Sequence, residues 1–175
     1  MLTNYKNIDD WFFLVPAAII IDFVVIVLGK YPGKDPYFKV NSLNTWYDRF
    51  GIFANISDIT SALIGIAGAR YIYTLLGLKN IAYFFAILLL FQACHDIFFY
   101  LAVILPVKEG ENGMIDVFKS YAKENGAKIL VADALIIFGT LFLASMLKAA
   151  PRHYTVSATL VSLYALCYIM FTRSP

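Results

Sequence analysis

Five long apolar segments, separated by polar stretches, set the pattern of residues along this chain. A helix rises about 1.5 Å per residue, so each segment is long enough to cross the roughly 30 Å hydrocarbon core of a bilayer. The pattern predicts an all-α integral membrane protein, a single transmembrane domain built as a helical bundle of about five transmembrane helices. The expected spans are residues 11–29, 51–76, 81–105, 128–147 and 154–171.

Two further segments have helical periodicity but are too polar to span. In residues 114–125, apolar side chains recur on one face of a helix and charged side chains on the other. A shorter amphipathic turn is expected within residues 42–50. Both should lie on the membrane surface, and Gly126 should end the longer one.

The loops define two sides of the bundle. We call the side of the N-terminus side A and the opposite side, which holds the loops at 30–50 and 106–127, side B. Five crossings would put the two termini on opposite sides. The basic loop residues are Lys30, Lys34, Lys39, Arg49, Lys108, Lys119 and Lys123 on side B and Lys6, Lys79, Lys148 and Arg152 on side A. The positive-inside tendency therefore predicts that side B faces the cytoplasm.

Composition agrees with a membrane protein. Of the 175 residues, 61% are hydrophobic and 15% charged, and the mean hydropathy is +0.71. Soluble domains usually have about 45–50% apolar and about 25% charged residues, so a soluble fold is not expected. The net charge of +2 is too small to indicate nucleic-acid binding. The first ten residues lack the basic region and cleavage site of a signal peptide, so we expect the first span to remain.

Each of the first four expected spans contains one aspartate. Counting from the helix ends places all four at a similar depth, nearer to side B, whereas Arg70 falls near side A and is too far along its helix to pair with Asp58. Gln92 and His95 share one side of a helix with Asp96. The predicted intramembrane polar layer is Asp22, Asp58, Gln92, His95, Asp96 and Asp133.

This layer has two interpretations. Buried acids mark proton relays, and carboxylates bind hard cations, so the layer could serve a small proton or cation channel or transporter. Alternatively, the acids bond to neighbouring polar side chains such as Gln92, Thr60 and Thr140 and fix the helix register. We favour the structural interpretation, because several acids lie within two turns of a helix end. Accordingly, we predict no metal ligand and no cofactor, and His95 is taken as a packing residue.

Enzyme motifs are absent from the sequence. It contains no CxxC pair, no HExxH, no GxSxG and no glycine-rich phosphate loop. Cys94 and Cys167 lie in apolar segments and are expected to be small buried hydrophobic residues. We therefore predict no catalytic residue, and an intramembrane enzyme with dispersed residues ranks third among the functions considered.

Several stretches resemble an uncharacterised multi-pass membrane protein family of the nucleocytoplasmic large DNA viruses. The most extended are LNTWYDRFGIFANISD at 43–58, HDIFFY at 95–100 and MIDVFKSYAKENG at 114–126, and shorter ones occur at 64–66, 69–73 and 132–133. The resemblance covers roughly residues 43–147. It implies a viral structural protein of the virion inner membrane, which derives from the host endoplasmic reticulum, and a minor capsid component that links membrane to shell.

A working surface on side B follows from these expectations. Its predicted docking residues are Trp46, Tyr47, Arg49, Phe118, Lys119, Tyr121 and Lys123, with the aromatic side chains at the level of the headgroups. The expected partners are the lipid bilayer and capsid or other virion membrane proteins, with a homo-oligomer as an option and no nucleic acid. The alternative is a pair of solvated loops without a partner.

Overall fold

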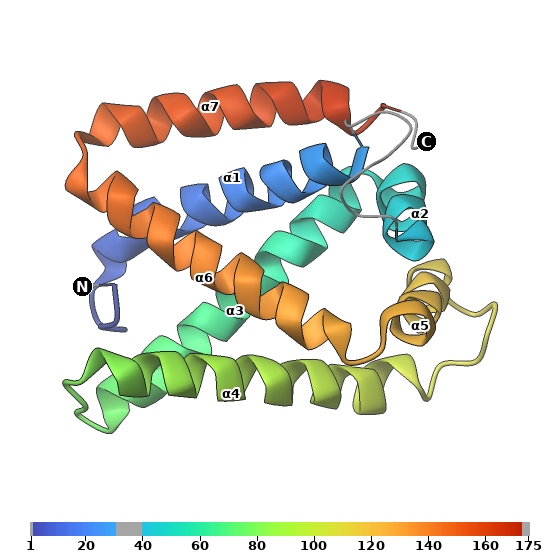
Figure 1. The fold of residues 1–175 in the computed structure, drawn as a ribbon, viewed down its shortest axis with the longest axis horizontal. Helices are drawn as coiled ribbons and strands as arrows, with labels where there is room; N and C mark the ends of the chain where they lie inside the picture. The colour runs from blue at the N-terminus through green and yellow to red at the C-terminus, as the bar shows by residue number, and fades with distance from the viewer. Residues whose placement is uncertain (1, 31–39, 173–175) are drawn as a thin grey trace.

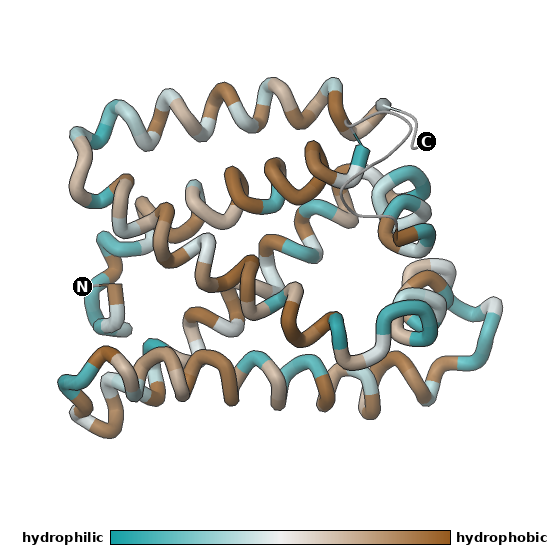
Figure 2. The backbone as a smooth tube through the Cα atoms, viewed as in Figure 1, coloured by the Kyte–Doolittle hydropathy of each residue, from teal (hydrophilic) through white to brown (hydrophobic). Residues whose placement is uncertain are grey.

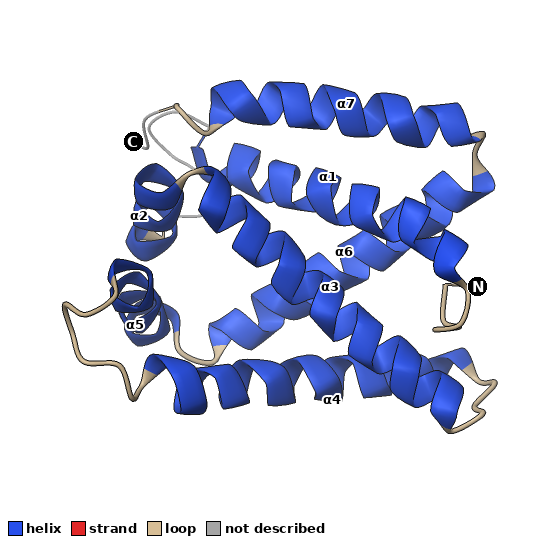
Figure 3. Cartoon of the chain, turned by 180° about the vertical axis from the view of Figure 1, so that it is seen from behind, coloured by secondary structure: helices blue, strands red, loops and turns tan. Residues whose placement is uncertain are grey.

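The computed structural model describes residues 2–30 and 40–172, and within these ranges the chain is helical and contains no strand (Figure 3). The helices are α1 (Trp11–Lys30), α2 (Asn41–Phe50), α3 (Ile52–Leu75), α4 (Ile81–Phe99), α5 (Gly113–Asn125), α6 (Lys128–Ala149) and α7 (Arg152–Ile169). A 3-10 turn, Ile8–Asp10, precedes α1, and a π-helical turn, Tyr100–Ile104, extends α4. The predicted all-α helical bundle is confirmed. Part of the predicted side-B loop at 30–50, including Lys34 and Lys39, lies outside the described residues.

Four of the described helices are long and apolar enough to cross a membrane. They are Ile8–Lys30, Ile52–Leu75, Ile81–Ile104 and Lys128–Ala149, and they coincide with the first four expected spans. The fifth expected span is indeed a helix, α7, but it is not among these four. It has 18 residues and starts with Arg152 and His153. The chain is therefore a membrane protein with four candidate spans, and a crossing by α7 stays a prediction.

The long helices run between two ends of the molecule (Figure 1). The N-terminal segment and the α3–α4 and α6–α7 turns lie at one end, side A, while α2 and α5 lie at the other, side B. In the bundle, α1 packs on α6 and α7, and α3 packs on α4. Figure 2 shows apolar residues along most of the long helices and hydrophilic residues gathered in α2 and at the N-terminus.

The two predicted surface helices are both present and lie side by side. The Asn112 side chain caps the start of α5 by accepting from the backbone N–H groups of Met114 at 3.0 Å and Ile115 at 3.2 Å. Gly126, with φ of 53°, ends α5 as predicted. Because α2 contacts α5 along its length, the two form one unit, which we call the side-B platform.

Helices α3 and α4 approach closely where α3 carries glycines. A Cβ atom on Gly65 would lie 2.1 Å from Gln92 Oε1, and one on Gly68 would lie 2.1 Å from Phe91 Cζ. Gly65 and Ala69, which follow Ser61 at four-residue intervals, are both buried. This face of α3 therefore uses small residues to admit a neighbouring helix, as is common in membranes.

An ionic cluster closes side A. Arg70, fully buried in α3, donates from Nη2 to the carbonyl oxygens of Asn4 at 2.6 Å and Asn7 at 3.0 Å and to Asp10 Oδ2 at 2.9 Å. Lys148 of α6 lies 2.6 Å from the other oxygen of Asp10. The N-terminal segment is thereby folded across the ends of α3 and α6. The sequence indicated the depth of Arg70 but not this partner.

Removing the Asp10 charge should destabilise the protein strongly. In Asp10→Asn, the buried Arg70 guanidinium keeps its charge and loses its counter-ion, so the free energy of unfolding should fall by about 3 kcal/mol. Denaturing-detergent titration in mixed micelles, followed by tryptophan fluorescence, measures this. The matched control is Asp9→Asn, which removes the same charge from an exposed neighbour. Equal stability of the two variants would show that the ion pair contributes nothing.

Candidate functional site

The polar layer begins with Asp58, in the second turn of α3. Its carboxylate accepts hydrogen bonds from Trp46 Nε1, at 3.2 and 3.1 Å to the two oxygens, and from the Tyr47 hydroxyl at 2.8 Å. The chain can make these contacts because Gly51, with φ of 53°, turns it sharply between α2 and α3. Only glycine adopts such a backbone conformation at little cost. Asp58 therefore fastens the surface helix α2 to the transmembrane bundle.

Asp22 joins α1 to α3 at the same end. It is buried and accepts a hydrogen bond from the side-chain amide of Asn55, which is buried as well. Asn55 lies one turn before Asp58, and the charges of Asp22 and Asp58 are close enough to interact. Asn55 was not among the predicted layer residues. The sequence feature that could have identified Asn55 is an amide side chain near the start of an apolar span, on the same side of the helix as Asp58.

The other half of the layer lies between α4 and α6. Gln92 Nε2 donates to Asp96 Oδ1 at 2.7 Å, and His95 Nδ1 lies 3.0 Å from the same oxygen. Asp133 of α6 lies within interaction distance of both Asp96 and Asp58. The four aspartates, one from each of four helices, thus lie close enough for the charges of neighbouring members to interact. Thr60 and Thr140, which were among the partners considered from the sequence, instead donate to carbonyl oxygens of their own helices.

Tyr47 of α2 and Tyr121 of α5, two tyrosines of the side-B platform, face this layer as neutral hydrogen-bonding groups. Burial, followed by the charges of Asp133 and Asp58, raises the pKa of Tyr121 to about 12. Burial and the charge of Asp58 likewise raise the pKa of Tyr47 well above its ordinary value. Both phenols therefore keep their protons at neutral pH and can donate to a carboxylate.

The chemistry available here is hydrogen bonding and proton exchange. Within the described part of the chain, no group of three His, Cys, Asp or Glu side chains is placed to hold a metal ion. Among the same residues, Asp96 Oδ2 and Gln92 Oε1 are buried and have no hydrogen-bond partner. The layer thus contains satisfied structural contacts at Asp22 and Asp58 and an incompletely satisfied carboxylate at Asp96.

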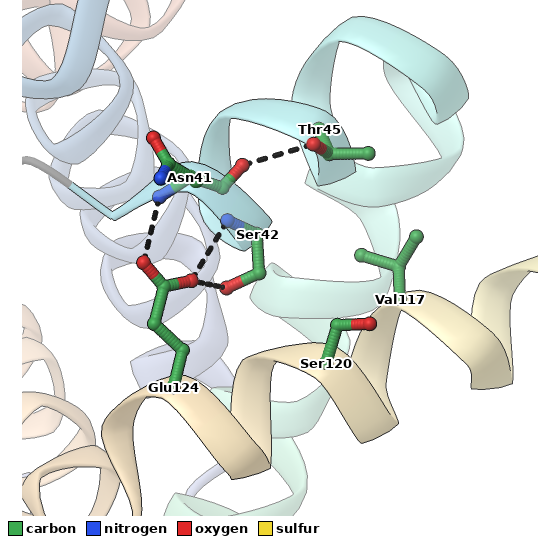
Figure 4. A pocket seen from close by; sticks show the side chains of 6 residues that line it. All are labelled: Asn41, Ser42, Thr45, Val117, Ser120 and Glu124. Atoms are coloured by element: carbon green, nitrogen blue, oxygen red, sulfur yellow. Dashed lines mark hydrogen bonds between the residues drawn. The ribbon is translucent and has the colours of Figure 1, made fainter.

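Glu124 of α5 holds the start of α2. Its carboxylate accepts from the backbone N–H groups of Asn41 and Ser42, both at 3.0 Å, and from the Ser42 hydroxyl (Figure 4). The hydrogen bonds from Ser42 lower the pKa of Glu124 below its ordinary value. These N–H groups belong to a helix N-terminus, where no intrahelical acceptor exists, so Glu124 acts as a cap supplied by another helix.

Aromatic and basic side chains complete the joint between α2 and α5. The Trp46 ring lies 4.7 Å from that of Phe118, and the Arg49 guanidinium reaches the start of α5 at Gly113. A hollow of about 440 Å³ remains at the joint (Figure 4). Its lining residues are Asn41, Ser42, Thr45, Val117, Ser120 and Glu124.

Lys30 adds a second fastening that the sequence did not reveal. It is buried at the end of α1, forms an ion pair with Asp48 of α2, and donates to the carbonyl oxygens of Met170 at 3.3 Å and Thr172 at 2.9 Å. One ammonium group therefore joins α1, α2 and the end of α7. In the sequence, Lys30 was simply the first residue of a polar loop.

The predicted docking residues divide into two sets. Trp46 and Tyr47 are buried beneath the platform, not on it, because their polar atoms turn inward to Asp58. Lys119 is committed to the carbonyl oxygen of Val107, and Phe118 and Tyr121 are half-buried. Only Arg49 and Lys123 of the predicted set are exposed. Both cysteines, Cys94 of α4 and Cys167 of α7, were expected to be buried but are exposed.

The Glu124 contact should respond to acid. Because its pKa is lowered by folding, the contact stabilises the platform above the pKa of an unfolded glutamate, about 4.3, and is lost as the pH falls through the folded value. Hydrogen-exchange protection of the Asn41 and Ser42 amides should therefore fall below about pH 4. Glu124→Gln should weaken protection at pH 7 and remove this pH dependence. The exposed Glu109→Gln should behave as wild type; if it matched Glu124→Gln, the cap would be irrelevant.

No protein family, no curated protein and no solved structure matches this chain.

Proposed function

We propose that this protein is a structural component of the inner membrane of a large DNA virus, in which the side-B platform holds the protein shell against the bilayer. The observation that carries the proposal is the way the platform is built. Two surface helices are locked to each other by Glu124 and by the Trp46–Phe118 contact, and both are bound to the membrane bundle.

Several hydrogen bonds and an ion pair connect the side-B platform to the transmembrane helices, which suits a surface that is pulled by a bound partner. Asp58 holds α2 to α3, Lys30 holds α2 to α1 and α7, and Lys119 holds α5 to the segment that follows α4. A partner that pulls on either surface helix would therefore pull on several transmembrane helices at once. Such a joint resists bending better than a loop pair that is free in solvent.

The outward face suits a protein partner. Arg49 and Lys123 are exposed beside acidic and neutral polar side chains, including Asp48 and Glu124. A surface of mixed charge favours specific contacts with a protein, whereas nucleic acid binds surfaces that are uniformly positive. The expected orientation agrees, since side B would face the cytoplasm and, in a membrane derived from the endoplasmic reticulum, the shell.

The viral resemblance falls mainly on this end of the molecule. The stretch 43–58 contains α2 and Asp58, 95–100 begins with His95 and Asp96, and 114–126 contains α5. The short stretch 69–73, which includes Arg70, is the exception on side A. These stretches are separate in the sequence but resemble the same family, and a common surface on side B is the simplest explanation for that.

Crosslinking of intact particles tests the proposal. An amine-reactive reagent should join Lys123 to capsid proteins, and these links should disappear in Lys123→Gln. Lys79, exposed in the α3–α4 turn on side A, is the internal control and should give no capsid links. Links from Lys123 exclusively to proteins of the particle interior would overturn both the orientation and the docking role.

A small proton channel or transporter is the second candidate, favoured by one observation. Asp96 Oδ2 is buried without a hydrogen-bond partner, next to Asp133. If the layer conducts protons, reconstituted liposomes should show a flux that Asp96→Asn abolishes. If the role is structural, the flux should not exceed that of empty liposomes and Asp96→Asn should fold normally. In Asp96→Leu the free energy of unfolding should fall by about 1–3 kcal/mol, because Gln92 loses the acceptor of its hydrogen bond.

A further inference from the structure

Helix α7 combines two properties that conflict in a simple bundle. It lies at the outer edge, packed on α1 with only a few contacts to α6 (Figure 1). It is also the one helix of 18 or more residues, among those described, that is not apolar enough to count as a candidate span. An edge helix exposes the most surface to lipid and should therefore be among the most apolar.

The contacts of α7 give it the same depth as α1. It starts on side A, after a short turn from α6, and it runs along α1 to side B. There the carbonyl oxygens of Met170 and Thr172, in the turn that follows α7, accept from Lys30. A helix fixed at both ends in this way crosses whatever layer α1 crosses.

The outward face of α7 carries hydroxyl groups among apolar side chains. Tyr164 and Tyr168 are 68% and 64% exposed, and the Tyr168 hydroxyl donates to the Tyr164 hydroxyl at 3.0 Å. The Tyr164 hydroxyl, which accepts this bond, keeps its own proton to donate. The face continues with Ser157 and Leu160, both exposed, toward side A. Lipid tails offer no acceptor for these groups.

We propose that this face packs against the same face of a second copy of the chain. Two copies inserted in the same direction are related by a two-fold axis along the membrane normal, so each residue meets its own equivalent at the same depth. A hydroxyl group both donates and accepts, so a tyrosine pair facing an identical pair is self-complementary. A partner that offered only donors or only acceptors would not be.

The spacing along this face suits a parallel helix pair. The outward positions Ser157, Leu160, Tyr164 and Cys167 recur at intervals of three and four residues. Such a repeat keeps one seam of a helix facing a partner helix over several turns. The dimer is independent of what docks on the side-B platform, and it would place two platforms on the same side of the membrane.

The two native cysteines provide a matched crosslinking experiment. Both are exposed, Cys167 on α7 and Cys94 on α4, and these helices form opposite edges of the molecule (Figure 1). In native membranes, a short bifunctional maleimide should give a crosslinked dimer of Cys94→Ala, which keeps Cys167. It should give little dimer of Cys167→Ala, which keeps Cys94. A Cys167 yield no higher than the Cys94 yield overturns the proposal.

A second measurement tests the role of the hydroxyls. In the Cys94→Ala background, Tyr164→Phe combined with Tyr168→Phe removes two oxygen atoms and keeps both rings. Interhelical hydrogen bonds in membranes are weak individually, so the dimer yield should fall about three- to tenfold at matched lipid dilution. The control is Tyr83→Phe on the exposed face of α4, which should leave the yield unchanged. An unchanged yield in the α7 double variant would contradict the hydroxyl-paired interface.

Discussion

A carboxylate inside a bilayer must find hydrogen-bond donors within the protein, because lipid supplies none. At Asp58 these donors come from Trp46 and Tyr47, so satisfying the carboxylate also determines where α2 lies. Once α2 is fixed over the bundle, its N-terminus meets Glu124 and its Asp48 meets Lys30. The position of α5 and the end of α7 therefore depend on a contact that begins with one intramembrane acid.

The two ends of the bundle solve the same electrostatic problem differently. On side A, Arg70 is compensated by an ion pair with Asp10 and by backbone carbonyls of the N-terminal segment. In the polar layer nearer to side B, Asp22, Asp58 and Asp96 accept hydrogen bonds from neutral amide, indole and phenol groups. The Arg70–Asp10 ion pair, which Lys148 extends, makes side A a structural end of the bundle. The acidic layer, which has an unpartnered oxygen at Asp96, keeps some capacity for protons or water.

Much of this architecture follows from the sequence, because apolar length and helical periodicity depend on residues close in the chain. The four candidate spans, the two surface helices and the common depth of Asp22, Asp58, Asp96 and Asp133 are of this kind. The partners are not, since they depend on how distant segments pack. Arg70 and Asp10 are 60 residues apart, and Lys148 and Asp10 are 138 apart. The expected position of Trp46 and Tyr47 on the docking surface was wrong for the same reason. An amphipathic pattern places these residues at the interface but does not show which way their polar atoms turn.

Lys30 connects the two surfaces proposed for this protein. The same ammonium group binds Asp48, on the platform helix α2, and the carbonyl oxygens of Met170 and Thr172, which directly follow α7. Because the group is buried, each contact restricts the others, and a shift of α7 would change the position of α2. A dimer formed through α7 would therefore hold the two platforms in a fixed relative orientation. Since a shell is a regular lattice, platforms with a fixed relative orientation match it better than platforms that turn independently, so the α7 interface and the docking surface support each other physically.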